Sequence, residues 1–224
     1  MFPISDVIPS RTRPVVTIGL IVLNTLAYLY QLQADEATLR DLVFDHGVVA
    51  ADLSLPDFLT AMFLHADILH FGGNMVFLWI FGDNVEDRLG HARYLVFFLV
   101  VGSLAALAQV AADPASQVPL IGASGAIAGV MGAYFLLYPQ SRVLTAVFLI
   151  VFMDVVEVPA IYFLGIWFLL QLAQGALTSS AGVQGGVAFW AHAAGFAAGA
   201  AVGMWLRSRS HVLESYWSGI KREP

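Results

Sequence analysis

The stretch Gly122-Ala123-Ser124-Gly125 opens an apolar run that continues to Tyr138. Its serine places a hydroxyl group at the edge of a segment apolar enough for a membrane. A serine hydroxyl acts as a nucleophile only when a base takes its proton and nearby donors stabilise the oxyanion that forms. Candidates for these roles lie near the starts of two other apolar runs, His192 in one and His70 with Asn74 in the other.

The composition indicates a membrane protein. Hydrophobic residues make up 59% of the 224 residues and charged residues only 12%, and the mean hydropathy is +0.78. A water-soluble globule of this composition would have too little polar surface to cover itself. Cysteine is absent, which excludes disulfide and thiolate chemistry. We therefore predict an all-α fold, a polytopic bundle of transmembrane helices.

Six apolar runs are predicted to cross the membrane, since a helix needs about 20 residues to do so. The second run is the most polar, because it contains His70, Asn74 and Asp83. Polar groups inside a bilayer normally face a protein or water-filled interior. The six runs are Val15–Leu32, Leu69–Val85, Tyr94–Ala112, Gly122–Tyr138, Pro159–Ala176 and Val187–Leu206.

A further apolar segment, Val143–Val156, is shorter and is followed by Glu157 and Pro159. If it crossed the membrane, the basic C-terminal residues would lie opposite Arg11 and Arg13, against the excess of Lys and Arg on the cytoplasmic side. We therefore expect this segment to be interfacial or re-entrant. In the six-span layout nine of the ten Lys and Arg residues fall on the inner side, and Arg40 is the exception.

The layout divides the chain into three parts. Residues 1–14 are predicted as a cytoplasmic segment, residues 15–206 as the six-span core and residues 207–224 as a cytoplasmic tail. The first loop, 33–68, is mostly acidic but contains apolar clusters, so we expect an ordered, partly membrane-lying connection on the outer side. The first run also has the basic start of a signal peptide, but it exceeds the about 7–15 apolar residues of such a segment.

Polar groups from three runs are expected at one depth. Ser124 lies about two residues, and His192 about five, into runs that begin at the outer face, so at ~1.5 Å per residue both lie within roughly 10 Å of that boundary. His70 and Asn74 enter from the same face, and their spacing of four puts them on one side of their helix. The sequence therefore predicts a shared site near the outer surface.

Each of these residues also has a simpler interpretation. A serine between glycines is more often a packing residue, and an intramembrane histidine can simply bond to a neighbouring helix. Glycines four apart let helices approach closely. Such contact would also bring Ser124 and His192 within hydrogen-bonding distance. The glycines at this spacing are Gly125 with Gly129 in the fourth run and Gly195 with Gly199 in the sixth.

Taken together, Gly122-Ala123-Ser124-Gly125, His70-x-x-x-Asn74 two spans earlier and Ala191-His192-x-x-Gly195 two spans later resemble the rhomboid family of intramembrane serine proteases. The resemblance covers essentially the whole six-span core. It implies hydrolysis of peptide bonds in or beside a transmembrane segment of another membrane protein, with Ser124 as nucleophile and His192 as general base. It also implies an oxyanion hole of His70, Asn74 and the Ser124 amide, with His65 as a further matching histidine.

The resemblance also implies the setting of the protein. We expect no metal or cofactor, transmembrane protein substrates and the lipid bilayer as partners, and no nucleic acid. The expected location is a bacterial inner membrane, with both termini cytoplasmic and the site open to the outer side. No acid is evident to orient His192, so we expect a Ser-His dyad through which acyl transfer proceeds.

Two positions depart from the family pattern. Some bacterial members carry an aromatic residue one turn after the serine, which stacks on the catalytic histidine, and this chain has Ala128 there. Those members also carry a Trp-Arg pair in the first loop, where this chain has Pro56 and Asp57. Neither change removes a reacting group.

Two other functions stay open. A proton-coupled transporter could use His65, His70 and His192 as a relay, since intramembrane ionisable groups often mark transport paths. A non-catalytic relative could bind and retain membrane clients, but it would not need both Ser124 and His192. A membrane metalloprotease is disfavoured because His-Glu-x-x-His is absent, and Asp83 supplies at most one aspartate of an aspartyl protease.

Overall fold

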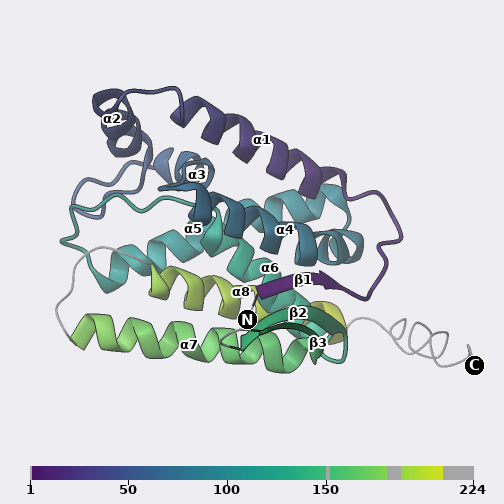
Figure 1. The fold of residues 1–224 in the computed structure, drawn as a ribbon. Coiled ribbons are helices and arrows are strands. Elements are labelled where there is room, and N and C mark those ends of the chain that lie inside the picture. Colours follow the sequence, from purple (N-terminus) through teal and green to yellow (C-terminus); the bar gives the residue numbers. More distant parts are fainter. Residues whose placement is uncertain (1, 150–151, 181–187, 209–224) are drawn as a thin grey trace, which may run out of the picture.

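Helices form most of the chain in the computed structural model, which describes residues 2–149, 152–180 and 188–208 (Figure 1). The helix α6 lies at the centre and contacts α4, α5, α7 and α8. Every residue of α6 from Gly125 to Tyr134 is buried. The helices are α1 Val15–Gln31, α2 Glu36–His46, α3 Asp57–Thr60, the 3₁₀ helix η1 Ala61–Phe63, α4 Ile68–Leu89, α5 His91–Ala112, α6 Ser124–Leu137, α7 Ala160–Ser180 and α8 Phe189–Ser208.

Each of the six predicted apolar runs forms one helix, although the helices differ in length. In the described ranges α5, α7 and α8 are long and apolar enough to cross a membrane, and α4 qualifies as a fourth span together with α3 and η1, from which it is bent by 97°. The apolar helices α1 and α6 are shorter, with 17 and 14 residues. At about 1.5 Å per residue α6 is roughly 21 Å long, less than the ~30 Å hydrocarbon core.

The prediction of an exclusively α-helical chain is wrong at three segments. A three-stranded antiparallel sheet, in the order β1-β2-β3, is formed by Phe2–Asp6, Arg142–Leu149 and Phe152–Pro159. The segment Val143–Val156, expected as an interfacial or re-entrant piece, supplies two of these strands. Its β-branched residues suit a pleated surface with one buried face. On that face Val143 and Thr145 are fully buried, whereas Arg142 and Glu157 form an exposed ion pair of 2.8 Å.

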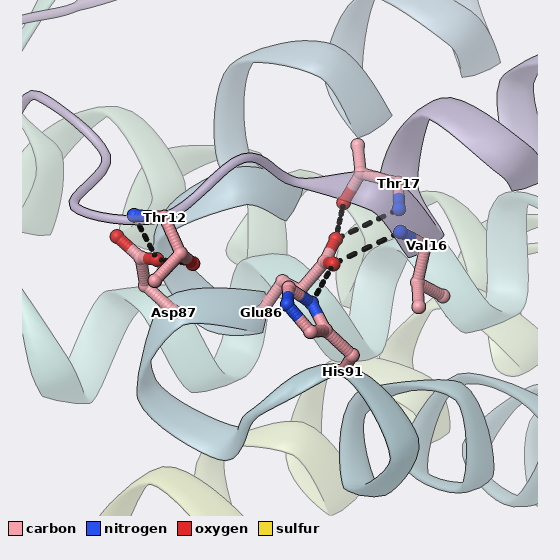
Figure 2. Close-up of polar contacts among 6 residues, drawn as sticks. All are labelled: Thr12, Val16, Thr17, Glu86, Asp87 and His91. Carbon is pink, nitrogen blue, oxygen red and sulfur yellow. Dashed lines mark hydrogen bonds and ion pairs between the residues drawn. The ribbon is translucent and has the colours of Figure 1, made fainter.

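A buried carboxylate ties the first helix to the bundle (Figure 2). Glu86, near the end of α4, is fully buried and accepts hydrogen bonds from the backbone amides of Val16 and Thr17 at 2.9 and 2.8 Å. The Thr17 hydroxyl also donates to it at 2.8 Å, and His91 Nδ1 lies 2.6 Å away. Because the first amides of a helix have no partner within the helix, Glu86 acts as the N-terminal cap of α1.

The next residue on α4 extends this contact to the segment before α1. Asp87 accepts a hydrogen bond of 2.9 Å from the amide of Thr12, and it also accepts from the Thr12 hydroxyl and the Arg11 amide. The segment that leads into α1 is therefore held by two consecutive carboxylates of one helix.

Glycines let the backbones of α6 and α8 touch. A Cβ built on Gly199 would lie 1.8 Å from the carbonyl oxygen of Gly129, and one on Gly195 would lie 2.2 Å from that of Gly125. Real side chains never approach backbone so closely, so any larger residue would push the helices apart.

We expect Gly199→Ala to lower the thermal unfolding temperature in detergent sharply, because overpacking costs about 1–3 kcal/mol or more when backbone must move. The matched control is Gly19→Ala on α1, where an added Cβ meets nothing within 4 Å. That variant should keep or slightly raise the unfolding temperature, since alanine is favoured over glycine within a helix by about 0.5–1 kcal/mol. Equal unfolding temperatures for the two variants would contradict the close contact.

Candidate active site

Ser124 is the first residue of α6, and its hydroxyl meets a histidine from α8. Ser124 Oγ lies 2.8 Å from Nε2 of His192. His192 lies in the first turn of α8, which begins at Phe189. The two residues are 68 positions apart in sequence, and the glycine contact between their helices brings them together.

The turn before Ser124 depends on a glycine. Gly122 has φ +115°, a left-handed conformation that residues with a Cβ rarely adopt. Its amide donates a 2.8 Å hydrogen bond to the carbonyl of Ala61 in the first loop. Two further bonds, of 3.0 and 2.9 Å, join the backbones of Val48 and Leu120. The first loop therefore holds the segment that leads into Ser124.

The side chains of His70 and Asn74 face this turn from α4. A Cβ on Gly122 would lie 2.7 Å from the His70 ring and 3.6 Å from Asn74 Nδ2. Asn74 is buried, and its Nδ2 has no hydrogen-bond partner among the residues that the structure describes. A buried amide without a partner costs free energy, so this group has an unused capacity to donate a hydrogen bond.

Asp67 fixes the start of α4, where His70 lies. Its carboxylate accepts hydrogen bonds of 2.8 Å from the amides of His70 and Leu69 and so caps the helix. These backbone bonds, the one from His70 above all, hold the pKa of Asp67 below its usual range. The cap orients the first turn of α4 and with it the His70 ring.

His65 lies behind these donors and does not reach the Ser124–His192 pair. The side chain is almost fully buried, and its ring centroid is 5.2 Å from that of His70 and 5.5 Å from that of Phe71. Its backbone exchanges two 3.0 Å hydrogen bonds with the side chain of Gln31. His65 therefore packs behind His70 and ties α1 to the start of α4.

A residue that the sequence analysis missed completes the surroundings of His192. Nδ1 of His192 lies 2.8 Å from Oε1 of Gln171 on α7, and the Trp167 ring lies 5.9 Å from the imidazole. Ala128, which replaces the expected aromatic residue, is fully buried in the core. The available signal was a pair of glutamines, Gln171 and Gln174, within the apolar run Pro159–Ala176.

A cavity of about 920 Å³ is lined by both Ser124 and His192. Its lining combines apolar side chains with few polar groups, as in other ligand sites. In the described ranges, no group of three or more His, Asp or Glu residues could hold a metal ion. The site residues on the cavity wall are His70, Asn74, Ser124, Trp167 and His192.

Comparison with known proteins identifies one domain and several relatives. The Rhomboid domain model matches residues 53–209. The putative rhomboid protease YdcA of Bacillus subtilis is 31% identical over 125 residues, which cover 55% of this chain and 62% of YdcA. The rhomboid protease GluP of the same organism is 39% identical over 75 residues, 34% of this chain and 14% of GluP.

A yeast relative is similar over a comparable part of the chain. Rhomboid protein 1, mitochondrial, of Saccharomyces cerevisiae is 36% identical over 90 residues, 38% of this chain and 26% of that protein. The matched segments thus span less than two thirds of the length of each of these relatives.

Proposed function

This chain belongs to the rhomboid family, and we propose that it is an intramembrane serine endopeptidase with Ser124 and His192 as its catalytic dyad. The observation that carries the proposal is the 2.8 Å contact between Ser124 Oγ and His192 Nε2 on the wall of a large cavity. A serine that only filled space between helices would not need a base in line with its hydroxyl. The substrates we propose are transmembrane segments of other membrane proteins.

The proposed reaction proceeds by acyl transfer. As Ser124 Oγ attacks the carbonyl carbon of the scissile bond, His192 Nε2 takes the hydroxyl proton. The tetrahedral intermediate collapses when the C–N bond breaks, and the imidazolium gives its proton to the leaving amine. Water then loses a proton to His192 and attacks the acyl-enzyme, and Oγ regains that proton as the acid product leaves. Neither half of the reaction needs a cofactor.

The proposed donors for the oxyanion come from α4 and from the first residue of α6. Asn74 Nδ2 is buried and unpaired within the described residues, and it lies on the same side of α4 as His70. Both face Gly122, two residues before the nucleophile. We propose that these two side chains and the Ser124 amide bind the oxygen that becomes negative in the tetrahedral intermediate.

We also propose that the core crosses the membrane six times, with its basic side in the cytoplasm. The sheet supports this count independently of charge, because β1 precedes α1 and pairs with β2 after α6. Two paired strands lie on one side of the membrane, so the chain between them must cross an even number of times. The helices α1, α4, α5 and α6 supply four such crossings.

The length of α6 sets the depth of the reaction. Because this helix is roughly 21 Å long and its inner end precedes β2, Ser124 lies below the outer surface of the ~30 Å hydrocarbon core. Peptide hydrolysis at that depth needs water, and the cavity around Ser124 supplies room for it.

The dyad is tested by Ser124→Ala and His192→Ala. Each change should abolish cleavage of a labelled single-span reporter in detergent, and the double variant should be little worse than either, because residues that act as one unit are strongly non-additive. A serine-directed fluorophosphonate should label the parent protein and neither variant. Proteolysis that survives Ser124→Ala would remove the nucleophile assignment, and a parent protein with no cleavage or labelling would favour the client-binding function.

The oxyanion assignment is tested on two asparagines of the same helix. Asn74→Ala should lower kcat by about 10²–10³ with little change in thermal stability, because the lost bond forms in the transition state. The control is Asn84→Ala, since Asn84 is buried at the inner end of α4, where its side chain bonds to Asp6 and Ile8. That variant should lose stability but keep its turnover per folded molecule. Full activity of Asn74→Ala would show that the oxyanion is bound elsewhere.

The six-span count is tested with single cysteines, for which the cysteine-free chain is suited. An impermeant thiol reagent applied to intact bacterial cells should label exposed positions of the outer loops, Asp45→Cys and Ala115→Cys. It should label the exposed inner positions Ala92→Cys and Asp154→Cys only after the cells are opened. Labelling of Asp154→Cys in intact cells would overturn the proposed topology.

A further inference from the structure

His192 is held by hydrogen bonds from two different helices. Its Nε2 contacts Ser124 on α6, and its Nδ1 lies 2.8 Å from Oε1 of Gln171 on α7. Only 9% of Gln171 is exposed. We propose that Gln171 is a positioning residue, whose side-chain oxygen holds His192 in the tautomer that can accept the serine proton. The inference rests on the proposed function of the Ser124–His192 pair.

A neutral imidazole carries a single ring proton, which sits on Nδ1 or on Nε2. With the proton on Nδ1, the ring donates to the Gln171 oxygen, and the lone pair of Nε2 faces the Ser124 hydroxyl. With the proton on Nε2, the ring presents a donor to Ser124 and cannot act as its base. An acceptor opposite Nδ1 therefore selects the reactive tautomer, as the acidic member of a serine protease triad does.

An amide suits this position in a membrane better than a carboxylate would. An ionised carboxylate inside a bilayer is costly to bury, whereas an amide oxygen accepts a hydrogen bond without carrying net charge. The bond also persists during the reaction, because the imidazolium keeps its proton on Nδ1. A hydrogen bond from a charged donor is the stronger one, so Gln171 favours the imidazolium as it forms.

Aromatic contacts fix α7 against the start of α8. They thereby hold Gln171 beside His192. The Phe168 ring stacks on Phe196 with centroids 4.6 Å apart, and Trp167 lies 6.1 Å from Phe196 and 5.9 Å from His192. Trp167 and Gln171 are four residues apart, so they share one face of α7. That face presents an aromatic ring and a hydrogen-bond acceptor to the same imidazole.

Two substitutions of Gln171 separate its role as a hydrogen-bond acceptor from its role in filling space. Gln171→Met keeps the length of the side chain but removes the acceptor. By analogy with the loss of a hydrogen-bond partner of a metal-binding histidine, kcat for a fluorophore-labelled single-span reporter should fall about 10–100-fold. KM should stay within about twofold, since substrate binding is not altered. Gln171→Glu keeps an oxygen acceptor in either protonation state and should restore most of kcat. If it falls as far as Gln171→Met, the inference is wrong.

The matched control is Leu164→Val on the same helix. Leu164 is fully buried in the core and lies two helical turns before Gln171. Its truncation should lower the unfolding temperature of the protein while kcat stays close to that of the parent. A loss of kcat equal to that of Gln171→Met would mean that loosening α7 is enough, and it would overturn the positioning role.

A spectroscopic measurement tests the tautomer without any substrate. In protein with ¹⁵N-labelled histidine in detergent micelles, the ring nitrogens of His192 should report a proton on Nδ1 in the parent and a mixture of tautomers in Gln171→Met. A proton on Nε2 in the parent, or an unchanged tautomer in the variant, overturns the inference. A parent that neither cleaves the reporter nor reacts with a fluorophosphonate counts against the proposed function, and the tautomer still decides the role of Gln171.

Discussion

Backbone atoms of α6 and α8 touch along a seam of glycines, and the relative position of the two helices follows from that contact. The carbonyl oxygens of Gly125 and Gly129 occupy the space where Gly195 and Gly199 would carry a Cβ. Association of helices in lipid depends on close packing rather than on removal of apolar surface from water. The seam therefore fixes the distance between Ser124 and His192, and a looser contact would leave the two side chains too far apart to hydrogen bond.

The sequence predicts the helices well because long apolar runs have few alternatives. The family resemblance, carried by the ordered motifs around His70, Ser124 and His192, is confirmed by the domain match. The strands β2 and β3 were missed since a short apolar segment does not reveal by periodicity whether it is strand or helix. Their partner β1 begins about 140 residues earlier, at Phe2. Gln171 was missed for another reason, because the apolar run contains two glutamines, Gln171 and Gln174, and the sequence does not show which of them faces His192.

The candidate site combines rigid and loop-borne parts. The proposed nucleophile Ser124 and its proposed base His192 lie on helices, whereas the turn at Gly122 is held by the first loop through Ala61. Catalytic geometry is sensitive to displacements of about 1 Å. The helices and the first loop therefore both contribute to the precision of the candidate site. The bonds between Val48 and Leu120 let the loop support the segment that leads into Ser124.

The Glu86 cap has a consequence for how the protein is made. The amide of Val16 is 70 residues ahead of the carboxylate that it binds. At a synthesis rate of about 5–20 residues per second, α1 exists for roughly 4–14 s before its partner leaves the ribosome. During that interval the first amides of α1 depend on water or lipid headgroups, which keeps this end of the helix at the membrane surface. The capping bond can form only after α4 has been made, so this end of α1 can be fixed to the bundle only after the synthesis of α4.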